Sequence, residues 1–308
     1  MSISNAPLVS IIIPLHNKAS FIRETWDSLQ SQTFQDWECL IVENRSTDNS
    51  LEVAQQIRDP RLQILITEAQ GPCSARNQGL RQARGKWILF LDADDLLPPN
   101  YLQSKMKLIQ EQPGRDLYSC PWEEQNPQGK TERHDPLGSH VSREEMLASA
   151  FIYPPFAIHT TLIRREMITP ELEWPESLDQ GLCEDAIFWF KLLHQGGIAF
   201  HDDTYAIYRT QTENFRNQVK NLPRLSQSYE KIIKANLQYL QDRNLKPTPR
   251  QAYYLYTFYQ KMEREAASEN LESIQKNARL NLNQIFPQLS PWDQLKIKFK
   301  KWIFPKSF

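Results

Sequence analysis

Short apolar runs alternate with longer amphipathic stretches over the first third of the chain. The apolar runs are rich in Ile, Leu and Val, which is typical of strands that are buried on both faces. Between them, apolar residues recur at helical spacing, as Phe21, Trp26 and Leu29 do. We therefore expect strands at 8–14, 37–43, 62–66 and 87–91, and helices at 20–32, 48–58 and 74–84.

This alternation of strand and helix predicts βαβ units, and hence an α/β fold with a mostly parallel sheet between two layers of helices. In such sheets, ligands bind at the carboxyl ends of the strands. The four predicted strands end in the polar segments PLHNK, ENRSTD, TEAQG and DADD. We expect all four segments to open on the same crevice.

Beyond Pro98 the pattern is less regular. Ser142 and Glu145 form a predicted capping box at one helix start, and two glycines after position 195 end another helix. The strand signal disappears near residue 215, so we expect a domain at 1–214 and a helical extension at 215–308. The expected elements are helices at 99–111, 143–151, 184–197, 223–242, 249–267 and 271–285, strands at 157–165 and near 198–208, and irregular strands and turns at 116–140.

Composition excludes several classes of protein. The formal net charge of −1 gives no reason to expect nucleic-acid binding. The four cysteines are widely spaced and form no C-x-x-C pair, which argues against a zinc site or a disulfide framework. The N-terminal segment lacks the features of a signal peptide, and no apolar run reaches the roughly 18 residues of a spanning helix. We expect a cytoplasmic protein, either soluble or peripheral to a membrane.

Glycine motifs that bind phosphate are absent. The chain has neither G-x-G-x-x-G after a strand nor G-x-x-x-x-G-K-[ST], and it has only 9 glycines. A site for a phosphorylated ligand would therefore need another source of positive charge, most simply a divalent cation held by carboxylates.

The segment LFLDADDLLPP places Asp92, Asp94 and Asp95 directly after the fourth predicted strand. Mg²⁺ and Mn²⁺ prefer oxygen ligands and are commonly held by one or two carboxylates together with substrate phosphates. Asp92 and Asp94 would leave the strand end on the same side, and Asp95 would be a further ligand or an acceptor behind them. The alternative is that Asp95 caps the next helix while the other two are solvated.

Other polar residues each have two interpretations. Arg76 is placed to contact a phosphate or a nucleobase from a helix start, or is an ordinary surface arginine. Glu184 and Asp185 provide a general base, or only stabilise the start of an aromatic helix. His16 and Asn17 close the first strand, where an imidazole ring can stack on a base. We interpret the remaining candidate ligands, His159, His194 and His201, as structural.

Taken together, these segments resemble the family 2 glycosyltransferases with the GT-A fold. VSIIIPLHNK, SLQSQTFQDWECLIVENRSTDNS, GPCSARNQGLRQARGKWILFLDADD and EDAIFWFKLLHQGG…YAIYR occur in the order of that family, over about residues 8–210. The set is specific, although each motif alone is weak, and the last third of the chain has no counterpart. The resemblance implies a Rossmann-like sheet with a C-terminal helical extension, in an enzyme of the bacterial polysaccharide or glycan type.

The resemblance also implies roles for individual residues. A nucleoside diphosphate sugar, with UDP favoured, would bind to the half at 1–97, and the half at 98–214 would bind the acceptor and carry out catalysis. Asp185 looks like the catalytic base, with Glu184 beside it. The positions that match donor-binding residues are Pro14, His16, Asn17, Glu43, Asn44, Arg76, Asp92 and Asp94, and those that match ligands of Mg²⁺ or Mn²⁺ are Asp92, Asp94 and Asp95.

Three departures from the family pattern affect these roles. An aromatic residue often stands where this chain has His16, and an Asp pair often stands where it has Glu43 and Asn44, so the nucleobase is left open. The family frequently has a His two residues after the Tyr-Arg matched by Tyr208-Arg209, whereas this chain has Gln211. One contact to metal or phosphate is left open by that difference.

The implied reaction is a single in-line displacement with inversion at the anomeric carbon. Asp185 would take the proton of a hydroxyl on a glycan or lipid-linked acceptor, and a metal would meet the charge of the leaving diphosphate. One alternative is a catalytically silent nucleotide- or glycan-binding module, which the intact acidic motifs disfavour. The other is a sugar nucleotidyltransferase, which generally has a glycine-rich loop after the first strand that PLHNKAS lacks.

The C-terminal segment 290–308 is basic and amphipathic. On a helix its apolar residues form one stripe, and five lysines against a single aspartate give it a net charge of +4. One interpretation is a helix that lies on the inner face of the plasma membrane. The other is a terminal helix docked on the catalytic domain. The residues of the stripe are Trp292, Leu295, Phe299, Trp302 and Ile303.

Overall fold

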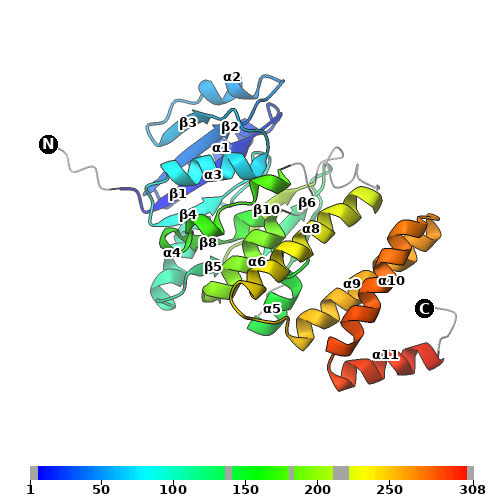
Figure 1. The fold of residues 1–308 in the computed structure, drawn as a ribbon. Helices are drawn as coiled ribbons and strands as arrows, with labels where there is room; N and C mark the ends of the chain where they lie inside the picture. The colour runs from blue at the N-terminus through cyan, green and yellow to red at the C-terminus, as the bar shows by residue number, and fades with distance from the viewer. Residues whose placement is uncertain (1–5, 136–140, 180–183, 211–221, 304–308) are drawn as a thin grey trace.

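The computed structural model of the chain is an α/β fold built on a seven-stranded sheet (Figure 1). It describes residues 6–135, 141–179, 184–210 and 222–303, with side chains described up to residue 298. The strand order is β3-β2-β1-β4-β8-β5-β9, and the first four of these are parallel to one another. The strands are β1 (Val9–Leu15), β2 (Trp37–Glu43), β3 (Leu62–Ile66), β4 (Trp87–Phe90), β5 (Leu117–Ser119), β8 (Leu162–Arg164) and β9 (Ile198–Phe200). The predicted fold class and the four predicted parallel strands are confirmed.

The central strands are buried on both faces because alternate side chains enter two separate cores. In β1, Ile11 and Ile13 point to one core, whereas Ile12 points to the other. The first core lies under α1 (Ile22–Gln30), α2 (Ser50–Gln55) and α4 (Tyr101–Glu111), and the second lies under α3 (Pro72–Gln82) and α6 (Asp185–Gln195). The sheet is therefore the middle of three layers, as the alternation of strand and helix predicts.

A second, three-stranded sheet packs beside the carboxyl end of β4. Its order is β10-β6-β7, with β6 at Trp122–Gln125, β7 at Thr131–His134 and β10 at Ala206–Arg209. An isolated antiparallel bridge between Leu96 and Ile207 joins β10 to the acidic loop that follows β4. This small sheet therefore brings a segment from far along the chain to the edge where ligands bind in parallel sheets.

Two predicted strands differ from the structure. Within 157–165, only Leu162–Arg164 form a strand, and Ile158–Thr160 form a 3-10 helix. The carbonyl groups there are used by other elements, because Tyr101 Oη donates to the carbonyl of His159 at 2.7 Å and Lys105 Nζ donates to that of Thr160 at 2.8 Å. The single strand expected near 198–208 is two strands, β9 and β10, which belong to different sheets.

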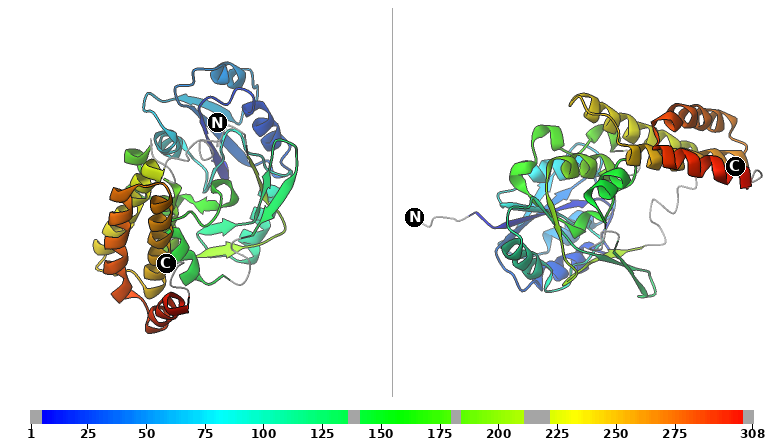
Figure 2. Two further views of the ribbon diagram at one scale, coloured as in Figure 1. Left: turned by 90° about the vertical axis from the view of Figure 1, so that its right-hand side faces the viewer. Right: turned by 90° about the horizontal axis from the view of Figure 1, so that it is seen from below.

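The C-terminal third is helical, as predicted, and it lies together at the side of the molecule away from β3 and α2 (Figures 1 and 2). Side chains from these helices, among them Leu240, Tyr256 and Ile285, join the core that lies under α6. The extension therefore shares a core with the α/β region and does not form a separate one. The helices are α8 (Leu222–Gln241), α9 (Pro249–Ser268), α10 (Glu272–Ile285) and α11 (Pro291–Ile303).

Helix α11 packs by a face that the apolar stripe does not include. Ile297 is buried in the core, whereas Trp292 and Leu295 of the stripe are 74% and 59% exposed. The side chains of Phe299, Trp302 and Ile303 lie outside the described residues. None of the described helices is long and apolar enough to cross a membrane.

Helix α5 (Arg143–Ala150) links the α/β region to α9. The hydroxyl of Ser142 accepts from the backbone N–H of Glu145 at 3.2 Å, which is half of the predicted capping box. The Glu145 carboxylate does not complete the box, because it accepts from Arg250 Nε and Nη2 of α9 at 2.6 and 2.8 Å. Tyr254 Oη donates to the same carboxylate at 2.5 Å. The Glu145 side chain therefore makes a tertiary contact with α9 instead of capping its own helix.

This pair gives a prediction for stability. In a double-mutant cycle of Glu145→Ala and Arg250→Ala, we expect a coupling free energy of about 1 kcal/mol, since the contact is bidentate but its side chains are 30% and 41% exposed. The hydrogen bonds from Arg250 hold the pKa of Glu145 below 4.5. Its stabilising contribution is therefore present above pH 4.5 and is lost as the pH falls through the lowered pKa.

Denaturant unfolding of the four variants, at about pH 7 and about pH 3, measures this coupling. The control is the same cycle for Lys261 and Glu265 on α9, whose charged atoms are 3.8 Å apart and whose side chains are 65% and 44% exposed. We expect about 0.3 kcal/mol there. Equal couplings in the two cycles, or a Glu145–Arg250 coupling that persists in acid, would contradict the role of this contact.

Candidate active site

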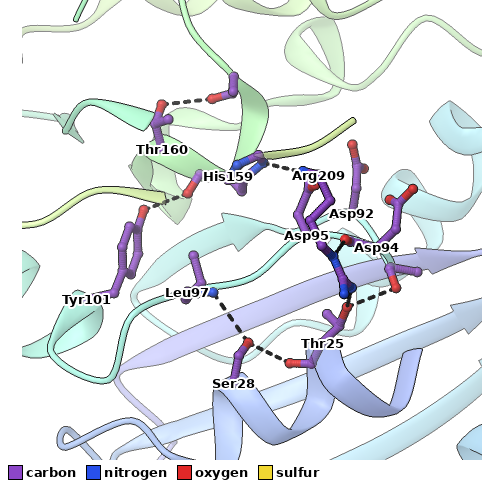
Figure 3. A network of polar contacts seen from close by, with 12 residues as sticks. Thr25, Ser28, Asp92, Asp94, Asp95, Leu97, Tyr101, His159, Thr160 and Arg209 are labelled. Carbon is purple, nitrogen blue, oxygen red and sulfur yellow. Dashed lines mark hydrogen bonds and ion pairs between the residues drawn. The ribbon is translucent and has the colours of Figure 1, made fainter. Parts of the chain in front are cut away.

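The acidic loop after β4 separates the three predicted carboxylates. Asp92 and Asp94 extend to the carboxyl edge of the sheet, whereas Asp95 turns inward to the interior (Figure 3). Asp95 is only 1% exposed, and the side chains of Asp92 and Asp94 are 33% and 13% exposed. The three residues therefore do not face one common point, although they are adjacent in the sequence.

Asp95 is held by two partners from remote segments. One carboxylate oxygen accepts from the backbone N–H of Arg209 at 2.9 Å, and the other lies 3.0 Å from His159 Nδ1. Burial raises the pKa of Asp95 to about 6, against the opposing effect of His159. Burial acts to lower the pKa of His159, but Asp95, with Asp92 and Asp94, outweighs it and the pKa is raised. This buried pair fixes the inner side of the acidic loop.

Arg209, the last residue of β10, joins that loop to helix α1. Its Nε donates to the carbonyl oxygen of Asp94, and its Nη1 pairs with Glu24. Its Nη2 donates to the hydroxyl of Thr25 at 3.3 Å, and that hydroxyl donates to the carbonyl of Ala93 at 2.9 Å. Arg209 is 8% exposed, and its guanidinium holds the backbone of the acidic loop in place.

Asp94 faces a lysine that sequence reasoning did not select. The ammonium group of Lys18, in the loop after β1, lies 2.5 Å from Asp94 Oδ2. The Lys18 side chain is 30% exposed, and its Nζ is 5.8 Å from the centre of the Phe21 ring. The carboxyl ends of two neighbouring strands, β1 and β4, thus contribute the two charges of this pair.

Arg76 connects the acidic loop to the start of α6. Its Nη2 donates to Asp92 at 3.0 Å and its Nη1 donates to Glu184 at 3.1 Å. The guanidinium is buried and lies 4.4 Å from the Trp174 ring, which supports it from one side. Burial acts to raise the pKa of Asp92, but the positive charges of Arg76, His159 and Lys18 together outweigh it, so this pKa lies below its usual value. The Arg76 guanidinium therefore contacts one residue from each of the two acidic motifs predicted from the sequence.

Glu184 and Asp185 begin α6 at the same edge. Asp185 is the first residue of the helix and is partly exposed, and Glu184 precedes it as the capping position. Because Glu184 and Asp92 share the Arg76 guanidinium, the start of α6 lies next to the acidic loop. The carboxylates that the helix dipole favours at this position thereby also lie next to the charged residues of the acidic loop.

The predicted nucleotide-side residues lie on the loops after β1 and β2. His16 Nδ1 lies 2.7 Å from the carbonyl oxygen of Asn44, and Asn17 Oδ1 accepts from the N–H of Thr47 at 2.7 Å. Glu43 is buried and accepts from the N–H of Ser46 at 2.5 Å. These contacts bring the two loops together, with Pro14 directly before them in β1.

The Asn44 side chain holds a third loop at this edge. It donates to the carbonyl groups of Ala69 and Gly71 at 2.9 and 3.1 Å, and it accepts from the N–H of Gly71 at 2.8 Å. Gly71 has a φ of 122°, and a Cβ there would lie 2.2 Å from the Asp179 Cβ. The chain therefore needs glycine at this position.

The N-terminus of α3 is already neutralised by the protein. Asp179 accepts from the N–H groups of Cys73 and Ser74 at 2.5 and 3.1 Å, and also from the Ser74 hydroxyl. The anion site that a helix start offers is thus taken by a carboxylate from the segment before α6. Arg76, one turn later, is the positive group of α3 that contacts the acidic loop.

The structure brings most of the predicted residues to one edge of the sheet, together with contacting residues that the sequence did not indicate. Lys18, His159 and Asp179 carry no motif of their own, and Arg209 was noted only as part of a family pattern. His159, interpreted as structural, is structural in the sense that it holds Asp95. Gln211, where the family often has a His, lies outside the described residues.

The donor set at this edge suits a hard divalent cation. Within the described ranges, no three His, Cys, Asp or Glu side chains converge as metal ligands. Mg²⁺ and Mn²⁺ do not require such a cluster, because they are commonly bound through one or two carboxylates and completed by substrate phosphates and water. Asp92 and Asp94, with partly exposed carboxylates, fit that requirement better than the buried Asp95.

Solved structures with a similar fold contain nucleotide sugars. The structure of Staphylococcus aureus TarS 1-349 in complex with UDP-GlcNAc matches 90% of this chain and 88% of that chain, with a TM-score of 0.62 and 20% sequence identity. The mannosyltransferase PcManGT from Pyrobaculum calidifontis in complex with GDP-Man and Mn²⁺ matches 98% of this chain and 89% of that chain, with a TM-score of 0.55 and 19% identity. At these identities the likeness shows the fold, which is GT-A.

Sequence relatives carry glycosyltransferase names. The chain is 25% identical over 267 residues to the Campylobacter jejuni protein named GalNAc(5)-diNAcBac-PP-undecaprenol beta-1,3-glucosyltransferase, over 83% of this chain and 84% of that protein. The match spans less than half the length of two other curated relatives, 43% for an uncharacterized glycosyltransferase of Haemophilus influenzae and 37% for the uncharacterized glycosyltransferase EpsJ of Bacillus subtilis. The family model described as "Glycosyl transferase family 2" matches residues 10–171, which is more than half of the chain. The protein therefore belongs to glycosyl transferase family 2.

Proposed function

We propose that this protein transfers a sugar from a nucleoside diphosphate sugar, with UDP favoured, to a hydroxyl group of a glycan or lipid-linked acceptor. The observation that carries this proposal is the double contact of Arg76 with Asp92 and Glu184, at 3.0 and 3.1 Å. It joins a carboxylate pair suited to a metal and diphosphate with a second carboxylate pair suited to proton transfer. Residues 1–97 form the donor half in this proposal, 98–214 the acceptor half, and 215–308 an extension packed on them.

The donor side follows from the acidic loop. Asp92 and Asp94 are the residues that would hold Mg²⁺ or Mn²⁺, which when bound supplies positive charge for the leaving diphosphate. Asp95 keeps the loop in place from behind, through His159 and Arg209. Arg76 is a permanent positive charge beside the same carboxylates and is placed to contact phosphate oxygens. His16 and Asn17 lie on the loop that would border the nucleobase.

The acceptor side follows from the start of α6. Asp185 is placed to accept the proton of the acceptor hydroxyl as that oxygen attacks the anomeric carbon. The C–O bond to the sugar forms as the bond to the diphosphate breaks, so the configuration of the anomeric carbon is inverted. Glu184, held by Arg76, fixes the start of the helix and hence the position of Asp185. No covalent nucleophile is needed for this reaction.

The properties of the tail helix favour an acceptor that is located at a membrane. Trp292 and Leu295 of α11 are exposed, although Ile297 of the same helix is buried. Five lysines lie between 290 and 308, and anionic lipid attracts such a segment. We infer peripheral contact with the inner face of a plasma membrane. The name of the Campylobacter jejuni relative, which includes undecaprenol, agrees with a lipid-linked acceptor.

The first test concerns donor binding. UDP at about 100 times its Kd should add about 2.7 kcal/mol to the unfolding free energy in the presence of Mn²⁺, and a thermal-shift assay measures this with GDP and dTDP as comparison nucleotides. The effect should disappear in Asp94→Ala, because the metal-binding oxygens are removed. Asp36→Ala, an exposed residue at the opposite end of β2, is the matched control and should behave as wild type. Equal stabilisation by UDP in excess EDTA would exclude the metal role.

The second test concerns the base. Asp185→Asn is nearly isosteric, so donor binding should be kept while turnover falls about 10²–10⁴-fold through loss of the proton acceptor. UDP release from a panel of UDP-sugars, with and without acceptor, measures turnover, and the exposed Asp202→Asn is the control. Wild-type turnover in Asp185→Asn would remove this residue from the mechanism. Retention of configuration in the product would rule out a single displacement.

The third test concerns the tail. Full-length protein should sediment with phosphatidylglycerol vesicles at low salt, less so at high salt, and little with phosphatidylcholine vesicles. The double variant Trp292→Ser/Leu295→Ser should lose most of this binding without loss of stability, because both side chains are exposed. Leu280→Ser, which alters a leucine of α10 that is 54% exposed, is the control. Unchanged sedimentation of the double variant would leave α11 as a packing helix only.

A further inference from the structure

The Lys18–Asp94 pair raises a question about how a cation could enter the site. Lys18 Nζ lies 2.5 Å from Asp94 Oδ2, so the ammonium group already neutralises the more buried of the two carboxylates that suit a metal. A divalent cation at the same carboxylate would lie within a few ångströms of this ammonium group. The Asp94 side chain is 13% exposed, so water screens the repulsion between the two cations only partly.

Lys18 can leave Asp94 more easily than the other cations of the site can leave their partners. Its side chain is 30% exposed, whereas that of Arg76 is 6% exposed and that of Arg209 is 9% exposed. Arg76 and Arg209 each contact two or more groups at once, whereas Lys18 has a single ionic contact among the described residues, to Asp94. A lysine is also a compact charge on a flexible four-carbon stem, which allows it to change partners.

We propose that Lys18 is a tethered counter-ion for Asp94. Because of this counter-ion, the site binds a divalent cation and a diphosphate together, rather than the cation first. The inference rests on the proposed function, since it takes the diphosphate of a nucleotide as the second ligand. When the cation binds at Asp94, the ammonium group is released and needs a new anionic partner. The diphosphate provides one at the same edge of the sheet, so the release of Lys18 favours nucleotide binding.

This arrangement is a thermodynamic coupling between two ligands. If the nucleotide raises the affinity for the cation by removing Lys18 from Asp94, the cation must raise the affinity for the nucleotide by the same factor. Substitution of Lys18 by a neutral residue should therefore change the two affinities in opposite directions. The cation alone should bind more tightly because its competitor is gone, and the nucleotide should bind less tightly because it loses a positive partner.

The experiment measures Mn²⁺ binding by the electron paramagnetic resonance of free Mn²⁺, first without nucleotide and then with UDP. In Lys18→Met, Mn²⁺ alone should bind about tenfold more tightly than in wild type, the scale expected for one unit charge a few ångströms away. UDP at saturating Mn²⁺, followed by calorimetry, should bind about tenfold more weakly. Lys130→Met, in the exposed turn between β6 and β7, is the matched control and should change neither affinity.

A second variant separates charge from packing. Lys18→Arg keeps the positive charge, so its affinity for Mn²⁺ alone should stay close to that of wild type. Unchanged or weaker binding of Mn²⁺ alone by a folded Lys18→Met would overturn the inference, and so would equal tightening in Lys18→Arg. If wild type binds UDP without any effect of Mn²⁺, the metal role in the proposed function fails as well. If Mn²⁺ and UDP enhance each other in wild type and equally in Lys18→Met, only the role of Lys18 fails.

Discussion

The compensation of three adjacent carboxylates is the constraint on which this structure depends. Asp92, Asp94 and Asp95 follow a fully buried strand, and negative charge at that place is costly without partners. Each carboxylate is met by positive or N–H groups from another part of the chain, supplied by Lys18, Arg76, His159 and Arg209. The acidic loop is therefore the point at which the first strand, the third helix, the 3-10 turn and the second sheet all meet.

The two ends of this network have different character. Asp95 lies in the interior, where its contacts with His159 and Arg209 are shielded from water and hold the loop. The side chains of Asp92 and Asp94 lie at the edge and are 33% and 13% exposed, so they are in contact with solvent. The inner part of the loop is therefore anchored by buried contacts, whereas its two outer carboxylates remain accessible.

The helical extension and the α/β region share one hydrophobic core. The helices of the extension complete the core under α6, and the Glu145–Arg250 contact ties α9 to α5. Helix α6 carries Glu184 and Asp185 at its start, so the packing of the extension against α6 helps to hold these two carboxylates in place. The exposed part of α11 lies on this extension, at a distance from β3 and α2 (Figure 2).

Much of the fold and site could be read from the sequence, because local patterns determine it. The alternation of apolar runs with amphipathic stretches predicted the parallel strands. The ends of those strands predicted that Asp92, Asp94 and the loops at His16 and Asn44 lie at one edge of the sheet. The sequence could not reveal that Glu145 contacts Arg250 rather than its own helix start, or that 158–160 is a 3-10 turn, since both depend on partners remote in the chain. Lys18, His159 and Asp179 were missed for the same reason. A buried charge requires a partner of opposite sign, but only the tertiary structure decides which residue is near enough to provide it.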